Sequence, residues 1–269
     1  MNFPDKIYKR HRLLRFFICI MAVFIGCACS LSLNSVEYEL ETDKISSPVK
    51  IAFISDVHNS LFGKDQSEIT GEIEKFGADL VLFGGDLFDE YNGEENSWTL
   101  VNELVGKYPC FYAVGNHEFE TGKSLEYKRK MAELGVTVLA DDSRVVDVNG
   151  QKVRICGTEH VWQTENAEAQ LDGTYSVLLH HYPDDFPELW EKDFDLILAG
   201  HAHGGQWRIP GLLNGVFAPD QGLFPRYAGG YYEENGTVML VSRGLWKHFG
   251  IMYIPRVFNR PELLLITIN

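Results

Sequence analysis

The chain has 269 residues, enough for one domain with a substantial core or for two small ones. It carries 24 Lys and Arg against 38 Asp and Glu, and the first 30 residues hold five of those basic residues but only one of the acids. The remainder therefore has an excess of 18 negative charges. Such a surface repels polyanions, so we expect no general nucleic-acid binding.

The N-terminal segment, residues 1–33, differs in kind from the rest. Five Lys and Arg residues between positions 6 and 15 precede an uncharged, mostly apolar run from Phe16 to Leu33. As a helix this run would be about 27 Å long, close to the hydrocarbon thickness of a bilayer. The basic flank should stay in the cytoplasm. We therefore expect a transmembrane signal anchor in the cell membrane, with the folded domain outside the cytoplasm.

Two alternatives stay open for this segment. Small residues at Gly26, Ala28 and Ser30 would suit a signal peptidase, and cleavage would give a secreted domain. The run from Phe24 to Cys27 faintly resembles a bacterial lipoprotein signal, so lipidation at Cys27 is the second alternative. All three interpretations place the folded domain outside the cytoplasm.

Residues 34–48 are polar and end at a proline, which predicts a connector. From residue 49 to residue 269, short apolar runs alternate with amphipathic stretches, the pattern of one α/β domain. Asn149-Gly150 lies between two apolar runs and predicts a β-hairpin, so part of the sheet should be antiparallel. The helices are expected at Ile69–Phe76, Leu100–Val105 and Leu125–Leu134. The strands are expected at Val49–Ser55, Leu80–Gly84, Cys110–Val114, Val136–Leu139, Val153–Cys156, Ser176–Leu179, Leu196–Ala199, Thr237–Val241 and Leu263–Ile268.

Five short polar blocks follow five of these strands directly. The carboxyl ends of strands are where the sites of α/β sheets assemble, and residues two apart project to one side. Asp, Asn and His are suitable ligands for divalent or trivalent ions. Each block alone is a common peptide, since Gly-Asp and Gly-Asn also occur in turns and helix caps. The blocks are Asp56-Val57-His58, Gly85-Asp86-Leu87-Phe88-Asp89, Gly115-Asn116-His117-Glu118, His180-His181 and Gly200-His201-Ala202-His203.

The order of these blocks resembles that of the calcineurin-like metallophosphoesterases, and the resemblance runs from about Val49 to the C-terminus. Within that family, Leu178–Asp184, Gly200–Gln206 and Gly222–Gly230 resemble a bacterial branch of membrane-associated phosphodiesterases. The resemblance implies a four-layer α/β/β/α sandwich. It also implies a dinuclear centre of manganese, iron or zinc ions.

The resemblance assigns the metal ligands position by position. It favours His181 over His180, because the ligand in this branch lies two residues before a proline, here Pro183. His180 would then lie behind the metal or face the substrate. The ligands are Asp56, His58 and His203 for one metal, Asn116, His181 and His201 for the other, and Asp86 for both.

The resemblance also implies the chemistry. Two adjacent cations lower the pKa of a bridging water, so that hydroxide attacks phosphorus. His117 would protonate the leaving oxygen, and Asp89 would hold His117 as an imidazolium. Arg226 and Arg243 are candidates for binding the substrate phosphate, with surface salt bridges as the alternative. Glu90 stands where the phosphoprotein-phosphatase branch has an arginine, which disfavours protein dephosphorylation.

The expected function is therefore that of a phosphodiesterase acting on a phosphodiester small molecule or a lipid-linked substrate near a membrane. The apolar stretch from Trp207 to Phe224 would suit a lipid part, and it would suit a wall of the core equally well. Two alternatives are a phosphomonoesterase of the same fold and a non-catalytic docking member of the family. Trp246 replaces a glycine expected in the phosphodiesterase branch.

Overall fold

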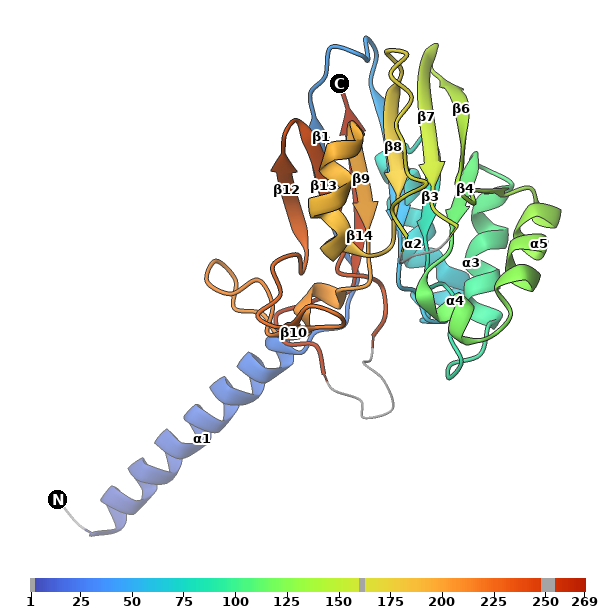
Figure 1. Cartoon of the computed structure of the whole chain (residues 1–269). Coiled ribbons are helices and arrows are strands. Elements are labelled where there is room, and N and C mark those ends of the chain that lie inside the picture. Colours follow the sequence, from blue (N-terminus) through green and yellow to red (C-terminus); the bar gives the residue numbers. More distant parts are fainter. Residues whose placement is uncertain (1–2, 160–162, 248–254) are drawn as a thin grey trace.

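The computed structural model describes residues 3–159, 163–247 and 255–269, without the side chains of residues 3–14 and 22. Two six-stranded mixed sheets pack face to face (Figure 1). The first has the order β1-β14-β2-β3-β4-β5 and the second the order β12-β13-β9-β8-β7-β6. The strands of the first sheet are β1 (Asn34–Leu40), β2 (Val49–Ile54), β3 (Leu80–Gly84), β4 (Cys110–Ala113), β5 (Thr137–Val138) and β14 (Glu262–Ile268). Those of the second are β6 (Asp142–Val148), β7 (Gln151–Gly157), β8 (Tyr175–Leu179), β9 (Leu196–Ala199), β12 (Gly230–Glu234) and β13 (Thr237–Val241).

Helices cover the outer faces of both sheets. Successive side chains of β3 point to opposite faces of the first sheet: Leu80 and Leu82 face the second sheet, whereas Val81 and Phe83 face the helices. The longer helices pack on the first sheet, and α6 packs on the second with a short 3-10 turn on either side. The helices are α1 (Phe3–Ala28), α2 (Ser67–Phe76), α3 (Glu95–Val105), α4 (Asn116–Glu120), α5 (Ser124–Leu134) and α6 (Phe186–Leu189).

The predicted α/β class is confirmed, and each expected strand and helix is present with boundaries that differ by a few residues. The hairpin prediction is also confirmed, because β6 and β7 pair antiparallel around Asn149 and Gly150. Both turn residues have positive φ, 54° and 77°, which asparagine and glycine tolerate best.

The predicted connector at 34–48 is wrong in its first half. Asn34–Leu40 forms β1, which pairs in parallel with β14 at the edge of the first sheet. The alternating acids of this strand are largely exposed, since an edge strand with one solvated face does not need an apolar run. Three further strands were not expected: β12, and the short pair β10 (Phe217–Ala218) and β11 (Gly222–Leu223).

The N-terminal helix α1 extends away from the two sheets (Figure 1). Among the residues that the structure describes, no helix combines the length and the apolar character needed to cross a membrane. The predicted transmembrane segment at 1–33 therefore finds no support. Leu33 instead packs against the core.

Candidate metal centre

The polar blocks converge because their strands run in the same direction. β2, β3 and β4 are mutually parallel, as are β8 and β9, so their carboxyl ends meet at one edge of the two sheets. Backbone hydrogen bonds tie the blocks together, from the Asp56 amide to the Gly85 carbonyl (3.0 Å) and from the Gly200 amide to the His181 carbonyl (3.0 Å). The His201 amide in turn donates to Oδ1 of Asp56 (2.8 Å), which joins a block of the second sheet to a block of the first, so the blocks of both sheets form one site.

Most of the predicted ligands have an unusual backbone conformation. Residues other than glycine rarely adopt positive φ, because this backbone conformation costs about 1–3 kcal/mol per residue and persists only where the surrounding structure enforces it. Strain of this kind concentrates at functional sites. The ligands with positive φ are Asp56 (51°), His58 (44°), Asp86 (54°), His201 (62°) and His203 (45°).

Two glycines of the blocks make room for the carboxylates. A Cβ at Gly115 would lie 2.1 Å from Oδ1 of Asp86, and a Cβ at Gly200 would lie 2.4 Å from Oδ2 of Asp56. Neither distance is compatible with a side chain. The glycines that precede Asn116 and His201 are therefore part of the site.

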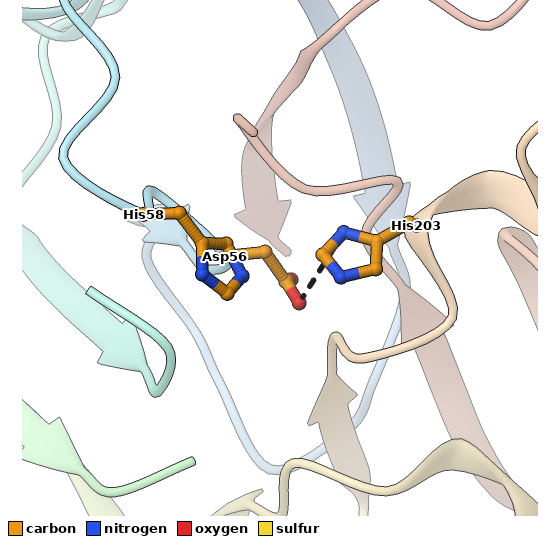
Figure 2. A group of neighbouring side chains, drawn as sticks. All are labelled: Asp56, His58 and His203. Atoms are coloured by element: carbon orange, nitrogen blue, oxygen red, sulfur yellow. Dashed lines mark ion pairs between the residues drawn. The ribbon is translucent and has the colours of Figure 1, made fainter. Parts of the chain in front are cut away.

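The first cluster consists of Asp56, His58 and His203, which offer ligand atoms within 4.8 Å of one another (Figure 2). All three residues are buried. In Figure 2 the Asp56 carboxylate points towards the ring of His203, and its Oδ1 lies 3.8 Å from Nδ1 of that ring. These are the three residues assigned to one metal from the sequence.

The second cluster consists of Asp86, His181 and His201, again with ligand atoms within 4.8 Å. Oδ2 of Asp86 lies 3.0 Å from Nε2 of His181 and 3.7 Å from Nε2 of His58. Asp86 thus lies between the two clusters, as a bridging carboxylate must. Asn116 belongs here too: Nδ2 of its amide donates to Oε1 of Glu120 (2.9 Å), which leaves Oδ1 for another partner.

The unsatisfied atoms of the site provide a test of whether metals fit it. Buried polar atoms almost always have a hydrogen-bond partner, so several without one at a single place call for an ion. Each of these atoms has a lone pair that can bind a metal ion, and each belongs to a predicted ligand. Buried and without a hydrogen bond among the described residues are Oδ2 of Asp56, Nε2 of His58 and Oδ1 of Asn116. Oδ2 of Asp86 and Nε2 of His181 have no hydrogen bond either, although they form an ion pair at 3.0 Å. The residues fit two metal ions.

The second ring nitrogen of three ligand histidines is held by the protein. Nδ1 of His58 faces Oδ2 of Asp89 (3.1 Å), and Nδ1 of His181 faces the Gly84 carbonyl (2.7 Å). Nε2 of His201 faces Oδ2 of Asp220 (2.7 Å). Such contacts fix the ring and the tautomer, so that the other nitrogen can bind a metal.

The pKa directions agree with ligand roles for Asp86 and His203. Burial opposes a charge on Asp86, but the neighbouring imidazolium of His181 holds the pKa of this carboxyl well below its usual range. Burial lowers the pKa of His181, but Asp86 outweighs that effect and raises it to about 10, so a metal bound at His181 would displace a proton from this ring. Burial and the nearby His58 keep the pKa of His203 well below that of an ordinary histidine, so its ring is neutral. An ionised carboxylate and a neutral imidazole are the forms that bind metals.

His117 is the most accessible of the six histidines in the blocks, with 17% of its side chain exposed. Burial lowers its pKa, but Asp86 and Glu90 outweigh that effect and raise it. The predicted partner of His117 is wrong. Asp89 contacts His58, and Oε2 of Glu90 lies 2.9 Å from Nδ1 of His117 instead. The tight loop after β3 turns the two neighbouring carboxylates towards different histidines.

Two further predictions about substrate contacts need correction. His180 does not face the substrate, because its side chain is fully buried with both nitrogens engaged, by Thr158 (3.1 Å) and Asp185 (2.8 Å). Arg243 is engaged by Glu262, with Nε 2.8 Å from Oε1, in a salt bridge that is largely buried and not on the surface, with 14% and 4% of the two side chains exposed. Arg226 is exposed and lies over the ring of Tyr227, and its substrate role stays a prediction.

Sequence reasoning missed three residues of the site. The buried carboxylate of Glu118 accepts four backbone N–H groups, including those of Asp86 (2.9 Å) and Gly115 (2.7 Å), and so holds two blocks together. Its place in the Gly-Asn-His-Glu block could have revealed it. Asp220 lies in a turn without any sequence signal. Trp246 stacks on His58 with ring centroids 4.1 Å apart.

The comparisons with known proteins agree with this geometry. The family model of the calcineurin-like phosphoesterases matches residues 49–205, a range that contains every block. The chain belongs to the calcineurin-like phosphoesterase family. It is thus a metal-dependent phosphoesterase, with buried His and Asp clusters consistent with two metal ions.

Individual relatives extend the similarity over most of the chain. Phosphodiesterase YaeI of Escherichia coli is 28% identical over 83% of this chain and 83% of its own length. The uncharacterized protein YpbG of Bacillus subtilis is 31% identical over 88% of this chain and 87% of its own. The crystal structure of TT1561 from Thermus thermophilus superposes with a TM-score of 0.51 at 12% identity, over 75% of this chain and 92% of that one, which supports the fold alone.

Proposed function

We propose that this chain is a phosphodiesterase that uses two metal ions, of manganese, iron or zinc, to hydrolyse phosphate esters. The position of Asp86 carries the proposal, since one carboxylate oxygen lies near ligand nitrogens of both clusters. Two adjacent ions, when bound, lower the pKa of water and neutralise the charge that develops on phosphate oxygens. The similarity to a protein named as a phosphodiesterase favours diesters over monoesters.

The other side chains of the site would have two roles, metal binding and proton donation. The six other predicted ligands, which surround Asp86, would complete the two coordination shells. His117 is the residue that would reach the substrate, because its ring is partly exposed whereas the side chains of His58 and His181 are fully buried. Its Nδ1 faces a carboxylate, which leaves Nε2 to hold the proton for the leaving oxygen.

We further propose that the substrate carries an apolar part. Six residues of the loop after His203 form an apolar loop surface and are exposed: Trp207, Ile209, Leu212, Phe217, Leu223 and Phe224. They are therefore not a wall of the core. The loop is folded on itself through hydrogen bonds from the Phe224 amide to the Val216 carbonyl and from the Val216 amide to the Trp207 carbonyl. Asp220 connects it to the metal centre through His201.

The location of the domain is also a proposal. A basic N-terminus followed by an apolar run supports export of the domain from the cytoplasm. Protease added to intact bacterial cells, or to cells stripped of their outer layers, should degrade the folded domain while a cytoplasmic marker survives. Survival of the domain together with the marker would refute the export proposal.

The test of the function is an assay of the purified full chain. Metal content is measured first, and the chain is then supplied with Mn²⁺, Fe²⁺ or Zn²⁺ and given bis-p-nitrophenyl phosphate and p-nitrophenyl phosphate. We expect faster hydrolysis of the diester, and loss of turnover after treatment with a chelator. Preference for the monoester would make the chain a phosphomonoesterase, and the absence of any hydrolysis would overturn the proposal.

A further inference from the structure

The adjacent carboxylates Asp89 and Glu90 face two different histidines of the site. Oδ2 of Asp89 lies 3.1 Å from Nδ1 of His58, and Oε2 of Glu90 lies 2.9 Å from Nδ1 of His117. The two rings stand edge to face with centroids 4.8 Å apart. One dipeptide therefore contacts both a metal ligand and the residue that would donate a proton.

We propose that this dipeptide divides two tasks: Asp89 positions His58 for metal binding, and Glu90 positions His117 for proton transfer. The inference rests on the proposed phosphodiesterase function. Both carboxylates are positioning residues, because each acts through a histidine and neither contacts the reacting atoms. Glu90 thereby has the role expected of Asp89 from the family resemblance, which is to hold His117.

Asp89 is rigidly held, as a partner of a metal ligand should be. Its side chain and that of His58 are fully buried. Its oxygens also accept the Tyr91 amide (2.8 Å), the Asn92 amide (2.7 Å) and Nδ2 of Asn92 (2.5 Å). An Nδ1–H of His58 directed at this carboxylate leaves the lone pair on Nε2, which has no hydrogen-bond partner among the described residues.

Glu90 lies at the accessible side of the site, with 26% of its side chain exposed. Its contact with Nδ1 of His117 fixes the ring and leaves Nε2 as the atom that carries the transferable proton. In the reaction, water oxygen bonds to phosphorus while the P–O bond to the leaving group breaks. The leaving oxygen keeps the bonding electron pair and takes the proton from Nε2. The proton released by the attacking water is passed to solvent, and solvent reprotonates Nε2.

A second carboxylate, Glu120, competes for the role of Glu90. Its Oε2 lies 3.6 Å from Nδ1 of His117, beyond hydrogen-bond distance. Its other oxygen accepts Nδ2 of Asn116 at 2.9 Å, so Glu120 orients a metal ligand. The geometry therefore favours Glu90 as the partner of His117.

The test compares two leaving groups on the full chain loaded with Mn²⁺: methyl p-nitrophenyl phosphate, and methyl phenyl phosphate, whose leaving oxygen is more basic and needs the proton more. Glu90→Gln should lower kcat for the phenyl ester by at least about tenfold, within the 10²–10⁴ that general acid catalysis supplies, and affect the nitrophenyl ester far less. The Mn²⁺ affinity, measured by calorimetry, should stay unchanged.

Asp89→Asn should give the opposite pattern. We expect the Mn²⁺ affinity to fall by about 10–100-fold, with equal effects on both esters once Mn²⁺ is saturating. Glu90→Asp should restore part of the phenyl-ester rate lost in Glu90→Gln. Glu103→Gln serves as the matched control, because Glu103 is an exposed carboxylate beside Lys107 on α3 and should change neither quantity.

Equal slowing of both esters by Glu90→Gln would overturn the inference, as would the leaving-group signature appearing in Glu120→Gln instead. Failure of the proposed function looks different, since the unaltered chain would then hydrolyse neither ester. In that case the Mn²⁺ affinity of Asp89→Asn still tests the first half of the inference.

Discussion

Two histidines of the same metal cluster, His181 and His201, are held in different ways. Nδ1 of His181 faces a backbone carbonyl inside the sheet, that of Gly84, and its ring is fully buried. Nε2 of His201 faces Asp220, a carboxylate on a surface hairpin with 54% of its side chain exposed. One ligand is thus fixed by the fold and the other by a loop, so the two sides of the cluster should differ in their tolerance to change.

The largest effect on metal content and turnover is expected from replacing His181, the ligand held by the sheet. His181→Ala removes a ligand, so it should lower the metal content and reduce turnover more than the roughly 10–100-fold typical of losing a ligand's partner. His180→Ala is the matched control: it should lower the melting temperature and leave the metal content intact, because His180 contacts only protein groups. Elemental analysis of both variants checks this. A normal metal content in His181→Ala would show that the ligand assignment is wrong.

The next prediction concerns the free energy of unfolding, to which the buried carboxylate of Glu118 should contribute. Glu118→Ala leaves four buried N–H groups without their acceptor, so the free energy of unfolding should fall by about 3 kcal/mol or more. Denaturant titration of the metal-free chain measures it. Glu133→Ala is the control, since Glu133 is exposed on α5, and it should change stability little. Similar unfolding curves for both variants would contradict the role given to Glu118.

On the loop side, Asp220→Asn keeps an acceptor for His201 but removes the charge. We expect a metal affinity about 10–100-fold lower, with a fold and melting temperature of the metal-free chain that are unchanged. Titration of the metal-free chain with Mn²⁺ provides the measurement. An unchanged affinity would mean that the contact at 2.7 Å does not support the ligand.

The smallest effect should come from the apolar loop surface. Replacing Leu212 and Phe224 by serine should leave hydrolysis of bis-p-nitrophenyl phosphate unchanged and raise KM several-fold for a diester with a long alkyl chain. Leu171→Ser is the control, because Leu171 is equally exposed (80%, against 81% for Leu212) outside this surface. The apolar part of the substrate is disproved if KM shows no dependence on chain length.

The five blocks show how far the sequence reaches. Each block follows an apolar run that predicts a strand. Because the carboxyl ends of such strands are where the sites of α/β sheets assemble, the sequence predicts that Asp56, Asp86 and His201 lie together. The choice of His181 over His180 came from the resemblance to the phosphodiesterase branch, whose ligand lies two residues before a proline, here Pro183. The resemblance did not identify the partner of Asp89, because two adjacent carboxylates look alike in a sequence, and only the course of the loop decides which histidine each one faces.

By itself the sequence determined the α/β class, the hairpin at Asn149-Gly150 and the residues able to bind metal, because these depend on local periodicity and on residue chemistry. Tertiary structure decided what depends on distant partners. β1 exists because β14 offers it an edge, Arg243 is engaged by Glu262, and Asp220 reaches His201 from a surface hairpin. These contacts join residues far apart in the chain, and local sequence patterns carry no information about them.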